Sequence, residues 1–260
     1  MGKKLIIGNW KMNLTIHEAS LYVHKLADLV KIHQGVEVVL APSHLALQPV
    51  SLQINYRQFK LAAQNFYWRD EGAFTGEVSA HQLRGLVQYA LVGHSERRHI
   101  FNEHDKDTRH KVQAAYRNGI VPVLCVGETV SERVAGETRD VLHDQVTGGL
   151  ANITSEEAAE LVIAYEPVWA IGTGNNASPT EVRAAAKMIR TQLKHLFGEQ
   201  VAESVRILYG GSVTLDTAAS YLSIQGIDGL LIGGASLDAH VFSTIINNTH
   251  DQLKGIKERR

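Results

Sequence analysis

The chain contains almost no cysteine. Its 260 residues include one, Cys125, so no disulfide can form within the chain and a reducing compartment is expected. An excess of either charge is also missing, since 26 basic and 27 acidic residues give a net charge of −1. Such a balance offers neither the basic surface typical of nucleic-acid-binding proteins nor a polybasic membrane anchor. We therefore expect no nucleic-acid partner and no membrane partner.

Long hydrophobic runs are missing as well. The apolar run at residues 5–7 is interrupted at once by Asn9 and Lys11, so it is too short for a signal peptide or a membrane span. These features predict a cytoplasmic protein. Histidines such as His99, His104 and His110 show none of the spacings of metal sites, so we expect no metal.

A repeated pattern is present instead: a short apolar, β-branched run followed by an amphipathic stretch. Eight runs are candidate strands, at residues 4–8, 36–41, 60–64, 89–93, 121–126, 160–166, 205–209 and 228–233. Several are apolar throughout, which is typical of parallel strands covered on both faces. Helical stretches lie between them, for example at 16–31, 106–118, 180–197 and 214–223. The pattern predicts an α/β fold, a (β/α)8 barrel of eight parallel strands ringed by helices.

A doubly wound sheet is the competing fold. It would usually show fewer units and a G-x-G-x-x-G fingerprint after its first strand, and this chain has no such fingerprint. The chain also lacks a linker or a shift in composition that would divide it. We therefore expect residues 1–260 to form a single barrel domain.

In a barrel of this kind, chemistry gathers where the loops after the strands converge. Asn9 and Lys11 leave the first strand two residues apart and can point to the same side, although a polar rim would explain them equally well. His94 follows the fourth strand, where a helix is expected to begin, and a helix N-terminus disfavours a protonated imidazole. The alternative is a structural histidine that is buried in the core with its hydrogen bonds satisfied. Ser95 and Glu96 beside it, however, belong to a polar cluster that an apolar core would not contain.

The sixth strand ends in a carboxylate, Glu166. Desolvation at the end of an apolar strand raises the basicity of such a group, so Glu166 is a candidate general base. Residues 167–174 follow, with a rigid proline, an apolar middle and the run Gly172-Thr173-Gly174. This composition is typical of a mobile lid, whereas an ordinary surface loop would leave its apolar side chains unexplained.

Paired glycines follow the last two strands, in Gly210-Gly211-Ser212 and Gly233-Gly234. Glycine lets backbone N–H groups approach an anion closely, and barrels often bind phosphate after strands seven and eight. One pair could serve a tight turn only, but two pairs at these two positions indicate a phosphate site.

These motifs make the chain similar to the triosephosphate isomerase family. The matching segments are residues 8–13, 63–65, 72–77, 93–98, 122–129, 164–174, 209–212 and 233–237, in family order along the whole chain. The resemblance implies a TIM barrel that interconverts dihydroxyacetone phosphate and D-glyceraldehyde 3-phosphate in glycolysis and gluconeogenesis, with no cofactor and no metal. It departs from the family pattern at Asn175-Asn176, at Asn102, where glycine is common, and at Ser43, where proline is common.

The resemblance also implies roles for the site residues. Glu166 would move the proton between carbons, His94 would polarise the carbonyl, and Lys11 with Asn9 would stabilise the enediolate and hold the substrate. Backbone N–H groups would hold the phosphate at Gly172, Ser212, Gly233 and Gly234. Three further residues would contact the catalytic side chains without touching the substrate: Ser95, Glu96 and Cys125. Thr75, on an aromatic-rich loop at 66–75, would reach into the twin subunit of a homodimer.

Two other functions remain open at this point. The first is another enzyme on the same barrel, either a different sugar-phosphate isomerase or a Schiff-base aldolase. The aldolase would need a desolvated lysine deep on a strand, and the later strands contain none. A catalytically silent barrel that only binds sugar phosphates would tend to lose the base or the electrophile, whereas Glu166, His94 and Lys11 are all present.

Overall fold

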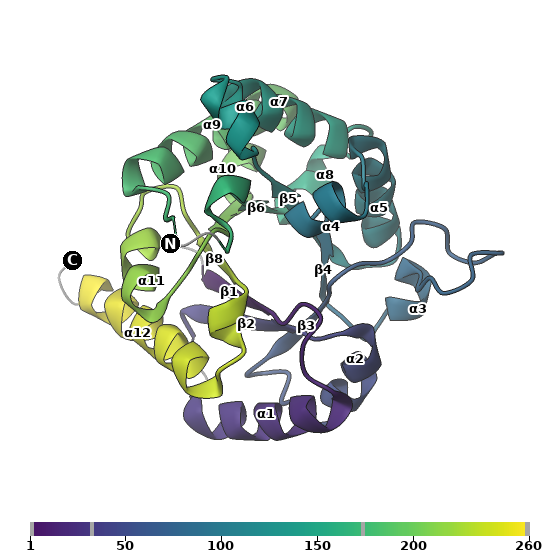
Figure 1. The fold of residues 1–260 in the computed structure, drawn as a ribbon, viewed down its shortest axis with the longest axis vertical. Coiled ribbons are helices and arrows are strands. Elements are labelled where there is room, and N and C mark those ends of the chain that lie inside the picture. Colours follow the sequence, from purple (N-terminus) through teal and green to yellow (C-terminus); the bar gives the residue numbers. More distant parts are fainter. Residues whose placement is uncertain (1–2, 32–33, 173–174, 258–260) are drawn as a thin grey trace.

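Eight parallel strands form a closed barrel in a computed structural model that describes residues 3–31, 34–172 and 175–257 (Figure 1). The strands follow one another around the barrel in chain order, and β8 pairs with β1. Their bounds are β1 Lys4–Asn9, β2 Val36–Ala41, β3 Lys60–Ala63, β4 Tyr89–Val92, β5 Val121–Val126, β6 Val162–Tyr165, β7 Arg206–Tyr209 and β8 Gly229–Ile232. Every expected strand is present, which confirms the (β/α)8 barrel. The sixth begins later than expected because a helix runs up to Glu160.

Helices surround the barrel and cover its outer face (Figure 1). They are α1 Ile16–Leu29, α2 His44–Ser51, α3 Ala80–Leu83, α4 Ser95–Ile100, α5 Asp105–Arg117, α6 Val130–Val134, α7 Thr138–Gly149, α8 Ser155–Glu160, α9 Pro179–Phe197, α10 Glu199–Ser204, α11 Leu215–Leu222 and α12 Ala239–Lys257, with short 3-10 turns η1 Val168–Ala170 and η2 Gly234–Ser236. The helix α9 shows why they begin where they do. Ser178 caps it, Glu181 completes the capping box, and Pro179 opens the first turn. None of the described helices is both long and apolar enough to cross a membrane.

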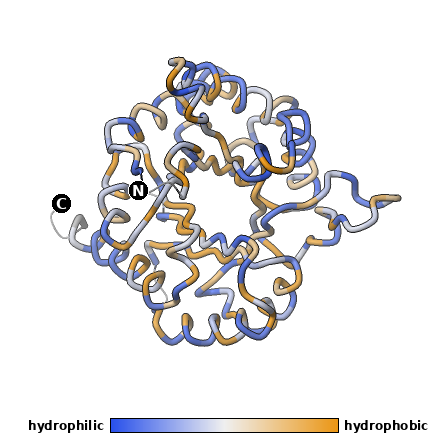
Figure 2. Tube along the Cα trace, viewed as in Figure 1, coloured by the Kyte–Doolittle hydropathy of each residue, from blue (hydrophilic) through white to orange (hydrophobic). Residues whose placement is uncertain are grey.

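The apolar core has two layers, because side chains alternate between the two faces of each strand. In β1, Leu5 and Ile7 belong to the cluster inside the barrel, whereas Ile6 belongs to the cluster between strands and helices. Figure 2 shows apolar segments along the barrel wall and on the barrel-facing sides of the helices. Both faces of each strand are thus covered, which explains the unbroken apolar runs in the sequence.

A polar network lies at the N-terminal ends of the strands. The Glu37 carboxylate on β2 accepts hydrogen bonds from Lys60 at 2.8 Å and from the Tyr89 hydroxyl at 2.5 Å. Arg206 on β7 lies 3.2 Å from the same carboxylate and donates to the Tyr89 hydroxyl at 2.8 Å. These four side chains are thus linked to one another by hydrogen bonds and ion pairs at this end of the barrel. The candidate site residues all lie at the opposite end.

Candidate active site

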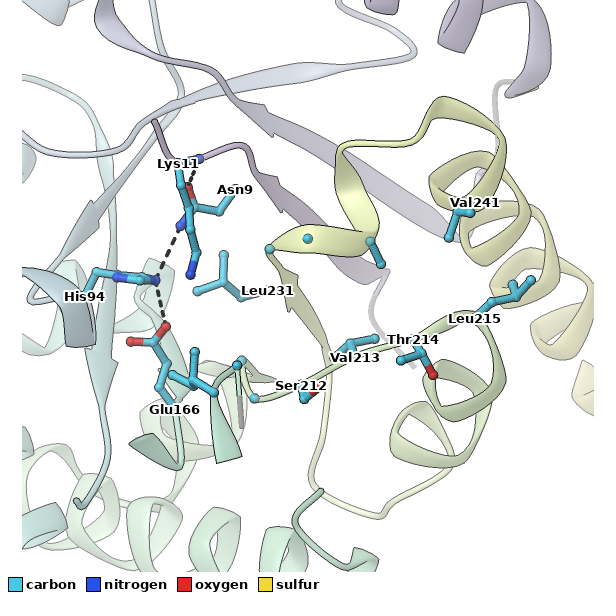
Figure 3. Close-up of a pocket in the computed structure, with 17 residues that line it drawn as sticks. Asn9, Lys11, His94, Glu166, Ser212, Val213, Thr214, Leu215, Leu231 and Val241 are labelled. Atoms are coloured by element: carbon cyan, nitrogen blue, oxygen red, sulfur yellow. Dashed lines mark hydrogen bonds and ion pairs between the residues drawn. The ribbon is translucent and has the colours of Figure 1, made fainter. Parts of the chain in front are cut away.

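One cavity of about 380 Å³ lies at the C-terminal end of the barrel and brings the predicted site residues together (Figure 3). Asn9, Lys11, His94 and Glu166 form one side of its wall. The other predicted substrate contacts also line it, namely Gly172, Ser212, Gly233 and Gly234. Five further residues, which the sequence analysis did not assign to the site, also line the cavity: Val213, Thr214, Leu215, Leu231 and Val241. Of these, Thr214, Leu215 and Val241 lie on the side of the cavity away from His94 (Figure 3).

His94 and Glu166 contact each other directly. Nε2 of His94 lies 3.0 Å from Oε1 of Glu166, and both residues are buried. The other carboxylate oxygen accepts a hydrogen bond from the backbone N–H of Ser95 at 2.9 Å. His94 is the N-cap of α4, as expected, and its Nδ1 accepts a hydrogen bond from the Glu96 N–H at 3.3 Å. An Nδ1 that accepts carries no proton, so this contact favours a proton on Nε2, facing the carboxylate.

The pairing reverses the expected pKa shifts of both groups. Burial by itself lowers the pKa of His94, but the Glu166 carboxylate raises it above its ordinary value. Burial by itself raises the pKa of Glu166, but the nearby His94 and the Ser95 N–H lower it below its ordinary value. The expectation of a more basic carboxylate is therefore wrong for this arrangement. For His94 the carboxylate raises the pKa against expectation, while the Glu96 N–H at the start of α4 still favours a neutral imidazole with its proton on Nε2. Each expectation considered one group alone. Burial is the largest single effect on both pKa values, but the partner group and its polar neighbours together reverse the direction of each shift.

Lys11 is held in place from several sides. Its backbone adopts a φ of 53°, a left-handed conformation that is unusual for a residue with a side chain. Its carbonyl oxygen accepts a hydrogen bond from Gln64 at 2.9 Å, and its N–H donates to Oδ1 of Asn9 at 3.1 Å. Its ammonium lies 2.5 Å from the Glu96 carboxylate. Nδ2 of Asn9 in turn lies 3.4 Å from Nε2 of His94, so side chains from the ends of β1 and β4 contact each other across the barrel mouth.

The segment after β6 is fixed at its start by a buried carboxylate, Glu128, that the sequence analysis did not single out. The Trp169 indole donates to Glu128 at 2.8 Å, and the Tyr165 hydroxyl donates at 3.1 Å. The Arg133 guanidinium stacks 3.5 Å from the Trp169 ring centre. Trp169 is therefore buried rather than exposed. Of the predicted lid, Thr173 and Gly174 lie outside the described residues.

Cys125 and Gly127 lie close behind the candidate base. Cys125 is completely buried, and burial together with the Glu166 carboxylate raises its pKa well above the ordinary value. Gly127 packs on the backbone of Glu166, where a Cβ atom would lie 1.8 Å from the Glu166 carbonyl oxygen. A side chain at position 127 is therefore excluded by the backbone that carries the carboxylate.

A second group that the sequence analysis did not single out is the Glu103 carboxylate, buried beneath the end of β4. It accepts a hydrogen bond from the Gly93 N–H at 3.0 Å, directly before His94. It also pairs with Lys111 at 2.5 Å and with Arg97 at 2.7 Å. The cations lower the pKa of Glu103 although burial opposes them. This network fixes the backbone from which His94 projects. The sequence gives no sign of the network, because it consists of contacts made by side chains in the folded structure.

The loop at 66–75 projects away from the barrel (Figure 1). Its aromatic residues pack on one another more than the sequence suggested: Phe66 is buried, and the Tyr67 ring lies 4.2 Å from that of Trp68 and 4.5 Å from that of Phe74. Phe74 and Thr75 stay exposed at the tip. Part of the aromatic surface of the loop is therefore packed within the protein, and part of it is exposed to solvent.

Comparisons with known proteins agree with this geometry. A family model described as triosephosphate isomerase matches residues 4–249. A relative from Carboxydothermus hydrogenoformans, named triosephosphate isomerase, is 45% identical over 96% of this chain and 100% of its own length. A relative of the same name from Clostridium tetani is 45% identical over 94% of this chain and 96% of its own length. Another, from Clostridium perfringens (strain SM101 / Type A), is 43% identical over 95% of this chain and 100% of its own length. The chain belongs to the triosephosphate isomerase family.

Proposed function

We propose that the cavity at the barrel end carries out the isomerisation for which the family is named, the interconversion of dihydroxyacetone phosphate and D-glyceraldehyde 3-phosphate in glycolysis and gluconeogenesis. The observation that carries the proposal is the 3.0 Å contact between His94 and Glu166 inside the cavity that Lys11 also lines. A base, a hydrogen-bond donor and a cation are the three groups that proton transfer beside a carbonyl requires.

Glu166 acts as the base. It takes a proton from the carbon next to the substrate carbonyl, and the electrons of the broken C–H bond form the enediolate. The proton then returns to the neighbouring carbon, which completes the isomerisation. Nε2 of His94 donates to the carbonyl oxygen and moves protons between the two oxygens, while the Lys11 ammonium, assisted by Asn9, stabilises the negative oxygen. The substrate supplies both the carbonyl and the acidic hydrogen, so these steps need no cofactor and no metal.

The phosphate is held by backbone N–H groups at Gly172, Ser212, Gly233 and Gly234. All four residues line the same cavity as the catalytic side chains. Gly233 lies close to the catalytic lysine, since a Cβ atom there would be 3.2 Å from Cε of Lys11. A phosphate beside Gly233 therefore lies within reach of the same ammonium that stabilises the enediolate. Ser95, Glu96 and Cys125 act by positioning Glu166 and Lys11.

The protein acts as a homodimer of single-domain subunits in the cytoplasm. Exposed apolar side chains follow four neighbouring strands at the same end of the barrel: Met12 after β1, Leu45 after β2, Phe74 after β3 and Phe101 after β4. Met12 is 97% exposed, which is costly for an isolated subunit. A second copy of the chain would cover this surface, with Thr75 reaching towards the site of its twin.

A coupled assay of glyceraldehyde 3-phosphate isomerisation, with and without a chelator, tests the proposal. Fast turnover that the chelator leaves unchanged is the expected result. A folded protein that binds substrate without turning it over would instead favour the silent sugar-phosphate-binding barrel.

A further inference from the structure

Tyr221 on α11 connects two segments that line the cavity without lining it itself. The side chain is buried, and its hydroxyl donates a hydrogen bond to the Ala177 carbonyl oxygen at 2.9 Å. Its ring stacks on that of Tyr209, with the ring centres 4.0 Å apart and the planes at 29°. One residue of a surrounding helix thus contacts both the β6–α9 connection and the end of β7.

The hydroxyl contact fixes the end of the segment that carries Gly172. Ala177 is buried and directly precedes Ser178, the cap of α9. The start of the same segment is fixed by Glu128 through Trp169. Trp169 and Ala177, which lie on either side of Gly172 in the chain, are thus each held by a side-chain hydrogen bond, and Tyr221 provides the one at Ala177.

The ring contact fixes the turn that carries Ser212. Tyr209 is the last residue of β7, and Gly210, Gly211 and Ser212 follow it directly into the cavity wall. Because stacked aromatic rings pack closely, a displacement of Tyr221 moves Tyr209 and the turn behind it.

We propose that Tyr221 is a positioning residue for the substrate phosphate: its hydroxyl and its ring set the spacing between the Gly172 segment and the turn at 210–212. This inference rests on the proposed function, because it assigns one phosphate to N–H groups on both segments. Hydrogen-bond donors act on an anion only at a narrow range of distances, so a change in this spacing weakens the binding of phosphate rather than the chemistry at the carbonyl.

The variant Tyr221→Phe tests the inference because it keeps the ring and removes the hydroxyl. Loss of one buried hydrogen bond predicts a fall of about two- to tenfold in kcat/KM for glyceraldehyde 3-phosphate. The inhibition constant of inorganic phosphate rises by a similar factor, whereas kcat/KM for D-glyceraldehyde, which has no phosphate, stays unchanged. The matched control is Tyr116→Phe, since the Tyr116 hydroxyl is buried and has no hydrogen-bond partner among the described residues.

An equal loss on both substrates, or an unchanged phosphate inhibition constant, would overturn the inference, because a purely structural role affects both substrates alike. The wild-type protein tests the proposed function separately, since its failure to turn over glyceraldehyde 3-phosphate would contradict that function whatever Tyr221 does. Amide hydrogen exchange on the wild-type protein gives a second readout that does not depend on a variant. Inorganic phosphate should slow exchange both around Ala177 and around Ser212, and protection of only one segment contradicts the inference.

Discussion

Nε2 of His94 lies 3.0 Å from Oε1 of Glu166, so the proposed electrophile and the proposed base are paired with each other. This contact uses the same atoms that the reaction requires. A substrate carbonyl that accepts a hydrogen bond from Nε2 must replace the carboxylate as its acceptor, and the carboxylate then loses one of the groups that lower its pKa. We therefore expect substrate binding to raise the pKa of Glu166, because burial remains and the contact with His94 is lost.

Shortening the base tests the role of Glu166. Glu166→Asp withdraws the carboxylate by one methylene, and a displacement of about 1 Å at a reacting centre costs on the order of 10²-fold in rate. We expect kcat to fall by about that factor while KM changes little, measured by steady-state kinetics with glyceraldehyde 3-phosphate. Glu160→Asp, an exposed glutamate at the end of α8, is the matched control. A near-normal kcat in Glu166→Asp would count against the assignment.

The titration of Glu166 tests the pairing itself. In the ligand-free protein, the carboxylate should stay ionised below its ordinary pKa of 4.5, because His94 and the Ser95 N–H stabilise the charged form. Removing the imidazole in His94→Gln leaves burial dominant and raises the pKa of Glu166. Carbon-13 NMR of labelled glutamate carboxyls measures both values. The exposed His99→Gln is the control, and an unchanged pKa in His94→Gln would contradict the assigned cause.

The buried network at Glu103 predicts a pH-dependent contribution to stability. Removing one partner of a buried ion pair leaves the other charge uncompensated, so Glu103→Gln should lower the free energy of unfolding by about 3 kcal/mol near pH 7. The folded pKa of Glu103 is depressed, so its contribution is present above pH 4.5, the ordinary value, and is lost as the pH falls further. Urea unfolding at several pH values measures the difference between variant and wild type.

The exposed pair of Asp70 and Arg117 provides the control for this experiment. Their side chains are 40% and 50% exposed, so Asp70→Asn should change stability little. A Glu103→Gln penalty no larger than that of Asp70→Asn, or one that grows as the pH falls below 4.5, would show that the buried pair does not stabilise the fold.

The proposed dimer surface can be tested at Met12. Met12→Asp places a charge at the centre of an apolar contact, so the variant should sediment as a monomer and lose turnover, whereas the wild type sediments as a dimer. Val134→Asp is the control, because Val134 is 83% exposed but lies on α6, outside the proposed surface. A fully active wild-type monomer at low protein concentration would contradict the proposed homodimer.

The strands were predictable from the sequence because each is a buried, β-branched run, and the barrel topology then placed the residues after them at one end. That is why Lys11, His94 and Glu166 could be expected to meet although they are far apart in the chain. The departure at Asn102 also has a structural explanation: its φ is 54°, a conformation that glycine adopts freely and asparagine tolerates.

The electrostatics of the site could not be predicted in the same way. The pKa shifts of His94 and Glu166 follow from a contact between two strand ends, and the roles of Glu128 and Glu103 follow from hydrogen bonds to distant segments. A sequence pattern indicates which groups are costly to bury. It does not indicate which neighbour compensates each of them, because that depends on side-chain geometry.

Gly127 has a consequence for the redesign of this pocket towards other substrates. Because a Cβ atom there would lie 1.8 Å from the Glu166 carbonyl oxygen, even alanine would push the catalytic backbone out of place. A library that diversifies the cavity should therefore keep position 127 constant. Leu215 and Val241 offer freer choices, since they line the same cavity away from His94 and Glu166, whereas Thr214 caps α11 and should also be kept.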